Sequence, residues 1–121
     1  MEYSIKGITL AVREMNKMLS FYKNVFGVSF KKQQINGTTL YAGIWAGMHL
    51  LLCPAELAGN TALQNRHQFD LLVKNFDVFI SLCTQYGGKL MGEVQEEDGV
   101  KKVGIYDPDN NSIVIIQSIT T

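Results

Sequence analysis

The side chains of this sequence that could take part in chemistry are few, and they fall within predicted strands. Gln68 and Asp70 are separated by one residue, so in a strand they point to the same face. His49 lies in a second predicted strand and Lys102 in a third. An amide, a carboxylate, an imidazole and an ammonium on one surface could bind a small polar molecule. Asp70 could pair with a cationic group of such a ligand.

Aromatic residues are predicted to line the same cavity. Strand alternation assigns Tyr41, Trp45 and Tyr106 to the face that carries the polar groups. Tyr41 and Trp45 could stack on a planar or cationic group. The result is an amphipathic pocket suited to a small organic ligand. The predicted pocket consists of Tyr41, Trp45, His49, Gln68, Asp70, Lys102 and Tyr106.

Each of these assignments has a structural alternative. Trp45 could belong to the core or to a dimer interface, and His49 could be an ordinary hydrogen-bonded histidine of a strand. Asp70 and Lys102 could pair with each other or face solvent. His67 would enter the pocket only if the strand register shifted by one residue.

Length and charge narrow the class of protein. The 121 residues are enough for one domain with a real core. The charges of the 11 basic and 11 acidic residues cancel, so the formal net charge is zero. We therefore expect no nucleic acid and no membrane surface as partner. The N-terminal residues lack the apolar stretch of a signal peptide, and no apolar run would span a bilayer. These features predict a cytoplasmic protein, in which Cys53 and Cys83 are reduced thiols.

The periodicity of apolar residues predicts an α+β fold. In the first half, the pattern indicates a strand over residues 3–12, a helix from 14 to 26, and strands over 28–33, 38–45 and 48–53. In the second half it indicates a strand over 67–73, a helix capped at its start by Asn75, and strands over 89–95, 100–106 and 112–117. Asn36-Gly37 is a strong hairpin signal.

The two halves repeat one βαβββ order. Gly7 and Gln68, Gly27 and Gly88, and Gly43 and Gly104 are each 61 positions apart. We therefore predict a single domain over residues 1–121. It would comprise a first module (1–54), a linker (55–66) and a second module (67–121).

Three segments carry a family resemblance. Residues 21–27 (FYKNVFG) resemble an FYxxxxG signature, and residues 107–113 (DPDNNSI) resemble a DPDGN turn before a last strand. Residues 12–15 (VREM) are similar to a VxDL sequence at the entry to the first helix. These signatures are those of the vicinal-oxygen-chelate superfamily, which includes glyoxalase, bleomycin-resistance proteins, fosfomycin-resistance proteins and extradiol dioxygenases.

The resemblance implies two βαβββ modules whose sheets curl into a half-open barrel around a pocket, usually in a homodimer. It also implies metal-ligand positions, which here are Gly7, Gln68, Val114 and one position within 50–52. Glycine and valine have no donor atom, and one neutral amide does not hold a divalent ion. We therefore expect no metal and no other cofactor.

Three functions follow as hypotheses. The first is a metal-free protein that binds a small molecule, similar to the bleomycin-resistance branch, without catalysing a reaction. The second is a metal-dependent lyase, isomerase or dioxygenase of glyoxalase type, with atypical ligands among His49, His67 and Gln68. The third is a non-catalytic regulatory or partner subunit. The sequence leans away from an enzyme and leaves the ligand open.

Overall fold

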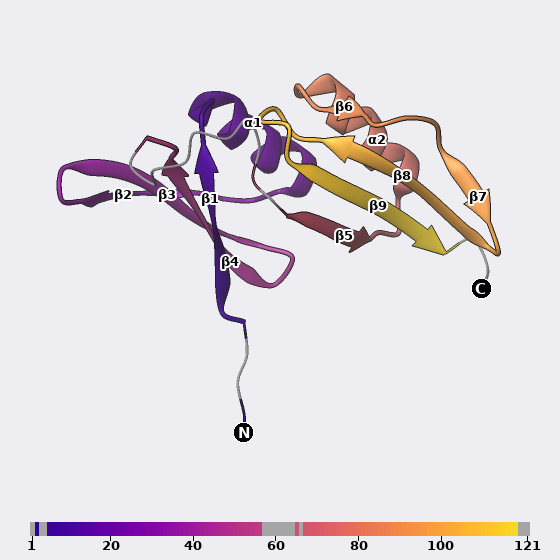
Figure 1. The fold of residues 1–121 in the computed structure, drawn as a ribbon, viewed down its shortest axis with the longest axis horizontal. Coiled ribbons are helices and arrows are strands. Elements are labelled where there is room, and N and C mark those ends of the chain that lie inside the picture. The colour runs from indigo at the N-terminus through magenta and orange to yellow at the C-terminus, as the bar shows by residue number, and fades with distance from the viewer. Residues whose placement is uncertain (1, 3–4, 57–64, 66, 119–121) are drawn as a thin grey trace.

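Two helices and two β-sheets make up the part of the chain that the computed structural model describes, which is residues 2, 5–56, 65 and 67–118 (Figure 1). The first module contains β1 (Gly7–Val12), α1 (Met15–Phe26), β2 (Lys31–Ile35), β3 (Thr38–Trp45) and β4 (Met48–Pro54). The second contains β5 (Gln68–Leu72), α2 (Phe76–Gln85), β6 (Lys89–Leu90), β7 (Gln95–Glu97), β8 (Val100–Tyr106) and β9 (Ser112–Ser118). The predicted α+β class and repeated βαβββ order are confirmed.

Each sheet is mixed, with its module's first and last strands paired in parallel. The first sheet has the order β1-β4-β3-β2, and the second has the order β5-β9-β8-β6 with β7 also paired to β8. The β1–β4 and β5–β9 pairs are parallel, while the hairpin strands are antiparallel. Neither sheet closes into a barrel within the described residues, which fits the predicted half-open arrangement.

The hairpins have turns in which both central residues take positive φ. These turns are Asn36-Gly37, Ala46-Gly47 and Asp98-Gly99, with φ between 50° and 80°. Turns of this kind match the right-handed twist of the flanking strands. Asparagine, aspartate and glycine adopt the conformation readily, whereas Ala46 does so at a cost.

Three predicted segments differ from the structure. The strand expected over 28–33 begins at Lys31, and the first strand is described from Gly7. The strand expected over 89–95 is divided into β6 and β7, because Gly92 between them adopts a φ of 143° that interrupts the pairing. Most of the predicted linker, 57–64 and 66, lies outside the described residues.

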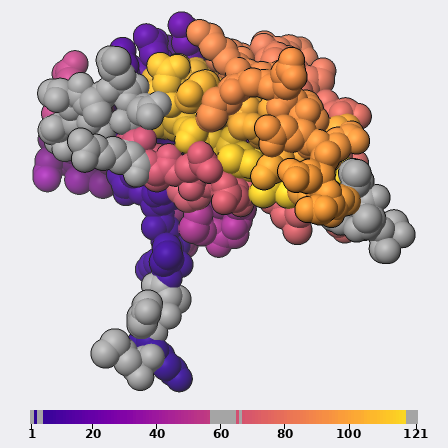
Figure 2. Space-filling view, turned by 45° about the vertical axis from the view of Figure 1, so that its right-hand side comes forward, coloured from indigo at the N-terminus to yellow at the C-terminus, as the bar shows by residue number. Residues whose placement is uncertain are grey.

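Buried side chains of both modules form one core. Leu10 and Leu52 from the first sheet and Ile105 and Ile115 from the second are almost fully buried with the inner faces of α1 and α2. The two helices lie next to each other in the upper part of Figure 1. The N-terminal end of β1 extends away from the body (Figure 2), and Ile5, just before this strand, is 79% exposed. None of the described helices is long and apolar enough to cross a membrane.

Candidate functional site

Each sheet has one face covered by a helix and one face free of helices. In the first module, Leu10 and Leu52 are register partners and both are buried, so they mark the helix-covered face. Residues one position away point to the other side. His49 and its partner Gly7 therefore lie on the helix-free face, where both are exposed.

The second module places four predicted pocket residues on its helix-free face. Gln68 pairs with Ser112 and Asp70 with Val114, on the side opposite to the buried Ile113 and Ile115. The same alternation in β8 puts Lys102 and Tyr106 on this face. The structure thus places Gln68, Asp70, Lys102 and Tyr106 on one surface, as strand alternation predicts.

The face predicted for Tyr41 and Trp45 needs correction. Tyr41 is the register partner of Leu52, and Trp45 is the partner of Met48, so both lie on the helix-covered face. Trp45 is only 3% exposed, and its ring centroid is 5.2 Å from that of Tyr22 and 5.1 Å from that of Phe69. Trp45 is therefore a core residue that joins the two modules.

A change in the repeat offset explains this error. The 61-residue offset aligned Gly43 with Gly104, but Gly43 pairs with Leu50 on the helix-covered face. Gly104 pairs with Val114 on the helix-free face. A shift of one residue exchanges the two faces of a strand, so the structural counterpart of Gly104 is Ala42, at an offset of 62.

Polar contacts link part of the predicted site. The amide nitrogen of Gln68 donates a hydrogen bond to Oδ1 of Asp70 at 3.2 Å, and the Ser112 hydroxyl donates to Oε1 of Gln68 at 3.4 Å. In the described part of the chain, Asp70 and Lys102 form no ion pair with each other. The second module thus presents to a ligand the amide of Gln68 and the carboxylate of Asp70, whose relative orientation these hydrogen bonds hold.

The two histidines lie in different surroundings. His49 is exposed in β4, and its backbone N–H donates to the carbonyl of Lys6 at 3.2 Å. The ring of His67 contacts that of Phe69 in a tilted arrangement, with centroids 4.7 Å apart and an interplanar angle of 57°, and burial lowers the pKa of His67. His67 therefore remains outside the helix-free face, and the register shift that would bring it there does not occur.

Hollows on the two helix-free faces are separate. One of about 330 Å³ in the first module is lined by residues that include Gln33, Ile44 and His49. Another of about 280 Å³ in the second module is lined by residues that include Lys102 and Val114. His49 and Lys102 thus line different hollows in the described part of the chain.

The residues at the four positions implied for metal ligands do not suit a metal ion. Three of these residues, Gly7, Leu51 and Val114, have no side-chain donor atom. The fourth, Gln68, is hydrogen-bonded to Asp70. A Cβ at position 7 would lie 2.5 Å from the carbonyl oxygen of His49, so a longer side chain needs the backbone to move. No group of three or more His, Cys, Asp or Glu side chains gathers among the described residues.

The cysteines are unsuited to nucleophilic chemistry. Both Cys53 and Cys83 are buried, and neither forms a disulfide. Burial, together with the nearby charge of Asp107, raises the pKa of Cys83 to about 11. A thiol with such a pKa stays protonated at neutral pH, and the thiolate is the reactive form.

Comparison with known proteins gives a consistent family. The sequence model described as Glyoxalase/Bleomycin resistance protein/Dioxygenase superfamily matches residues 4–115, and none of the curated proteins matches the chain. Among solved structures, the fosfomycin resistance protein FosX from Listeria monocytogenes is similar with a TM-score of 0.79 at 16% identity, over 100% of this chain and 95% of that one.

Two further structures have the same fold. A glyoxylase/bleomycin resistance protein/dioxygenase domain from Frankia has a TM-score of 0.77 at 16% identity, covering 98% of this chain and 93% of that one. Listeria FosX complexed with Mn(II) and sulfate has a TM-score of 0.76 at 18% identity, covering 98% and 92%. The segments at 12–15, 21–27 and 107–113 thus indicated the correct family. The chain belongs to the glyoxalase/bleomycin resistance protein/dioxygenase superfamily.

Proposed function

We propose that this protein binds a small organic molecule on its helix-free faces and does so without a metal. The observation that supports a metal-free site is the scarcity of donor atoms at the four positions implied for metal ligands. Three of them lack a donor atom, and position 7 is closed against a Cβ by the backbone of His49. A divalent ion usually needs several nitrogen, oxygen or sulfur ligands, which these residues do not supply.

The ligand is best matched by a molecule with an apolar body and a cationic or hydrogen-bonding group. Gln68 and Asp70 provide an oriented amide and carboxylate, and Tyr106 on the same face is half-buried. The carboxylate of Asp70 is exposed and can pair with a ligand ammonium. Tyr106 lies on β8 and Asp70 on β5, with β9 between them. A carboxylate and an aromatic ring on one face can together bind a small organic cation that spans the strand between them.

We also propose that the working form is a homodimer. The hollow beside His49 and the hollow beside Lys102 lie in different modules, and each is small for an organic ligand. Exposed apolar side chains occur on both helix-free faces, with Ile44 at 54% and Leu72 at 78% exposure. A second copy could cover them by setting the first module's face against the second module's face. The two hollows would then join into one pocket.

The experiment combines metal analysis with ligand screening on freshly purified, untagged protein. We expect less than about a tenth of an equivalent of any divalent metal per chain. We expect a cationic aromatic compound to raise the melting temperature of the wild type, and to do so less for Asp70→Asn. Asp77→Asn, which alters an exposed carboxylate on α2, is the control. If no compound of a broad panel stabilises the protein, the binding function is contradicted.

A metal-dependent lyase, isomerase or dioxygenase of glyoxalase type is the second candidate. It is favoured by one observation, the similarity in fold to a FosX structure that contains Mn(II). About one equivalent of metal per chain would support it, as would catalysis that appears on adding manganese, zinc, nickel or iron. The same metal analysis therefore separates the two candidates.

A further inference from the structure

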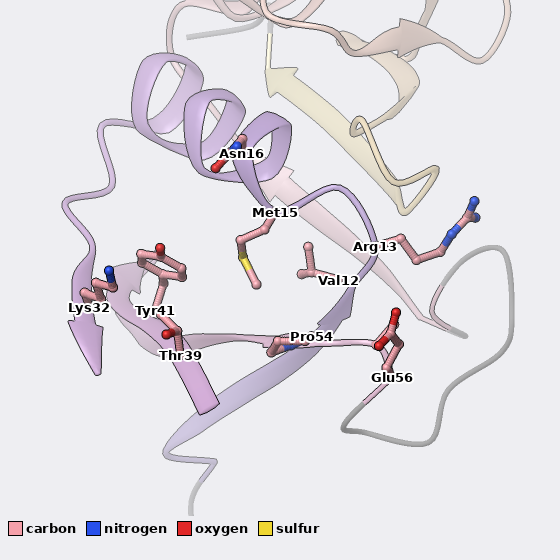
Figure 3. Close-up of a pocket in the computed structure, with 10 residues that line it drawn as sticks. Val12, Arg13, Met15, Asn16, Lys32, Thr39, Tyr41, Pro54 and Glu56 are labelled. Carbon is pink, nitrogen blue, oxygen red and sulfur yellow. The ribbon is translucent and has the colours of Figure 1, made fainter. Parts of the chain in front are cut away.

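A groove lies on the helix-covered side of the first module, away from the helix-free faces. One part, of about 680 Å³, is bounded by the start of α1 and by strands β2, β3 and β4 (Figure 3). A second part, of about 520 Å³, continues along α1. Lys32 and Tyr41 line both parts, so we treat the two as one feature, the α1 groove.

The groove exists because α1 covers only part of its sheet. The buried face of α1, which includes Met18, Phe21 and Tyr22, belongs to the core with β1 and β4. All five residues of β2 are exposed, so no helix covers this edge of the sheet. The space between α1 and β2 is therefore open along its length.

The walls of the groove combine apolar surface with positive charge. Met15 and Leu19 from α1 face Tyr41 from β3, which is half-buried. Figure 3 shows the ammonium of Lys32 beside the ring of Tyr41, with the thioether of Met15 pointing into the space next to them. Lys23 lines the part of the groove that continues along α1.

The lysines of the groove have no acidic partner among the described residues, where neither Lys23 nor Lys32 forms an ion pair. Glu56 is the acid among the lining residues, and Figure 3 shows it at the other end of the hollow from Lys32, beyond Pro54 and Met15. The end that contains Tyr41 therefore carries positive charge that a bound anion could neutralise.

We propose that the α1 groove binds a small organic anion with a flat apolar body, of the aryl carboxylate class. The carboxylate would pair with Lys32, and the ring would lie against Tyr41 and Met15. This site is independent of the helix-free faces and takes a ligand of the opposite charge. It also gives Tyr41 a binding role on the face where the structure places it.

The test is an NMR titration of ¹⁵N-labelled full-length protein with three naphthalene compounds: the 2-carboxylate, the neutral 2-methanol and the cationic 2-methylamine. We expect the carboxylate to bind saturably with a Kd of about 1 mM or tighter. Its affinity should exceed that of the alcohol by about two- to fivefold, as for a partly exposed ion pair. The shifted amides should include those of Met15, Lys32 and Tyr41.

Two variants of one strand provide the matched comparison. Lys32→Gln removes the charge beside Tyr41, whereas Lys31→Gln removes the same charge from the opposite face of β2, where Lys31 pairs with Ala42. We expect Lys32→Gln to reduce carboxylate affinity to that of the alcohol, with Lys31→Gln unchanged.

Three outcomes would overturn the proposal. They are no saturable binding of the carboxylate, an equal effect of both lysine substitutions, and shifts confined to amides around His49 or Gln68. The third outcome would mean that the anion binds on the helix-free faces and not in the α1 groove. The proposed binding of a cationic ligand on those faces is tested separately, by the Asp70→Asn variant.

Discussion

The hydroxyl of Tyr22 donates a hydrogen bond to Oδ2 of Asp107 at 2.9 Å, joining α1 of the first module to the turn before β9 of the second. Both residues are at most 2% exposed. Asp107 also accepts hydrogen bonds at 2.9 Å from the backbone N–H groups of Asp109 and Asn111 and from the side-chain amide of Asn111. These donors offset part of the cost of burying a carboxylate.

The same turn also contacts the start of α1. The carboxylate of Asp109 accepts hydrogen bonds from the backbone N–H groups of Arg13 at 2.7 Å and Glu14 at 3.1 Å. The first turn of α1 contains no acidic residue of its own. Asp109 thus supplies, from the other module, the negative charge that a helix N-terminus favours. The turn at 107–111 is therefore a structural connection between modules.

Replacing Tyr22 by phenylalanine should weaken this connection without creating a large cavity. A hydrogen bond to a charged group contributes about 1.5–3 kcal/mol, and its loss leaves Asp107 with one donor fewer. We expect Tyr22→Phe to lower the free energy of unfolding by that amount, measured by urea denaturation. Tyr86→Phe is the control, because the Tyr86 hydroxyl has no hydrogen bond in the described structure and its loss should cost less than about 0.5 kcal/mol. Equal effects of the two substitutions would contradict the assignment.

The stability of the protein should depend on the ionisation of Asp107. Burial raises the pKa of Asp107, although the hydrogen bonds from Asn111, Tyr22 and Asp109 act to lower it. The folded protein therefore holds this proton more tightly than the unfolded chain. The stabilising contribution of Asp107 is then present below the unfolded pKa of about 3.9 and is lost as pH rises through the folded pKa.

We expect a ¹³C NMR titration of the Asp107 carboxyl to have its midpoint above that of an ordinary aspartate. Relative to Asp107→Asn, the wild type should lose unfolding free energy as pH rises across this interval. The slope is the informative quantity, because the substitution can also replace Oδ2, which accepts two of the four hydrogen bonds of Asp107, by an NH2 group that donates. A midpoint below the ordinary aspartate value would contradict the prediction.

Much of the fold could be predicted because local signals agreed with one another. Asn36-Gly37 and the sequence at 107–111 mark turns through the conformations that their residues favour, and the structure has turns at both. The helices follow from apolar residues at helical spacing. The contacts that Asp107 and Asp109 make with the first module could not be predicted, since they join residues 85 to 96 positions apart.

The candidate site was less predictable, because it depends on strand register. Strand alternation placed Gln68, Asp70, Lys102 and Tyr106 on one face of their sheet, where the structure has them. It failed for Tyr41 on β3, where the repeat offset changes by one residue. The alignment of the two modules in this region depended on matching Gly43 with Gly104. A glycine has no side chain, so its residue type does not indicate which face of the strand it occupies.

Gly43 and Gly104 should respond differently to alanine substitution. A Cβ on Gly43 would lie 2.7 Å from Cγ1 of Val28 and 2.9 Å from the backbone oxygen of Ser29, neither of which moves easily. A Cβ on Gly104 would meet the sulfur of Met91 at 2.9 Å and its Cβ at 3.1 Å. The sulfur can move with a side chain that is 38% exposed, whereas the Cβ requires a small shift of the chain next to β6. We expect Gly43→Ala to cost about 1–3 kcal/mol of unfolding free energy and Gly104→Ala less than Gly43→Ala. Chemical denaturation of both variants tests this, and the reverse order would show that the register of β3 is different.

The start of α2 should depend on Gln117 and not on Asn75. Asn75 occupies the N-cap position as predicted, but its side chain makes no capping hydrogen bond. Oε1 of Gln117 instead accepts the N–H of Phe76 at 2.7 Å, from the neighbouring strand β9. We expect Gln117→Ala to lower the free energy of unfolding by about 1 kcal/mol, as for the loss of an N-cap. Asn75→Ala should have a smaller effect, and a larger one would restore Asn75 as the cap.

Ala46 offers a site for stabilisation, because its φ of 50° is unfavourable for an alanine. The hairpin turns at 36–37 and 98–99 have asparagine and aspartate at the corresponding position, with φ of 50° and 51°. Ala46 is exposed, so a longer side chain can extend into solvent. We expect Ala46→Asn to raise the free energy of unfolding by about 0.5–1 kcal/mol and the melting temperature by about 2–5 °C.

Calorimetry measures both quantities. Ala55→Asn is the contrasting variant, because Ala55 is 8% exposed and a polar side chain there should destabilise the protein. A lower melting temperature for Ala46→Asn would mean that the turn between β3 and β4 does not have this conformation.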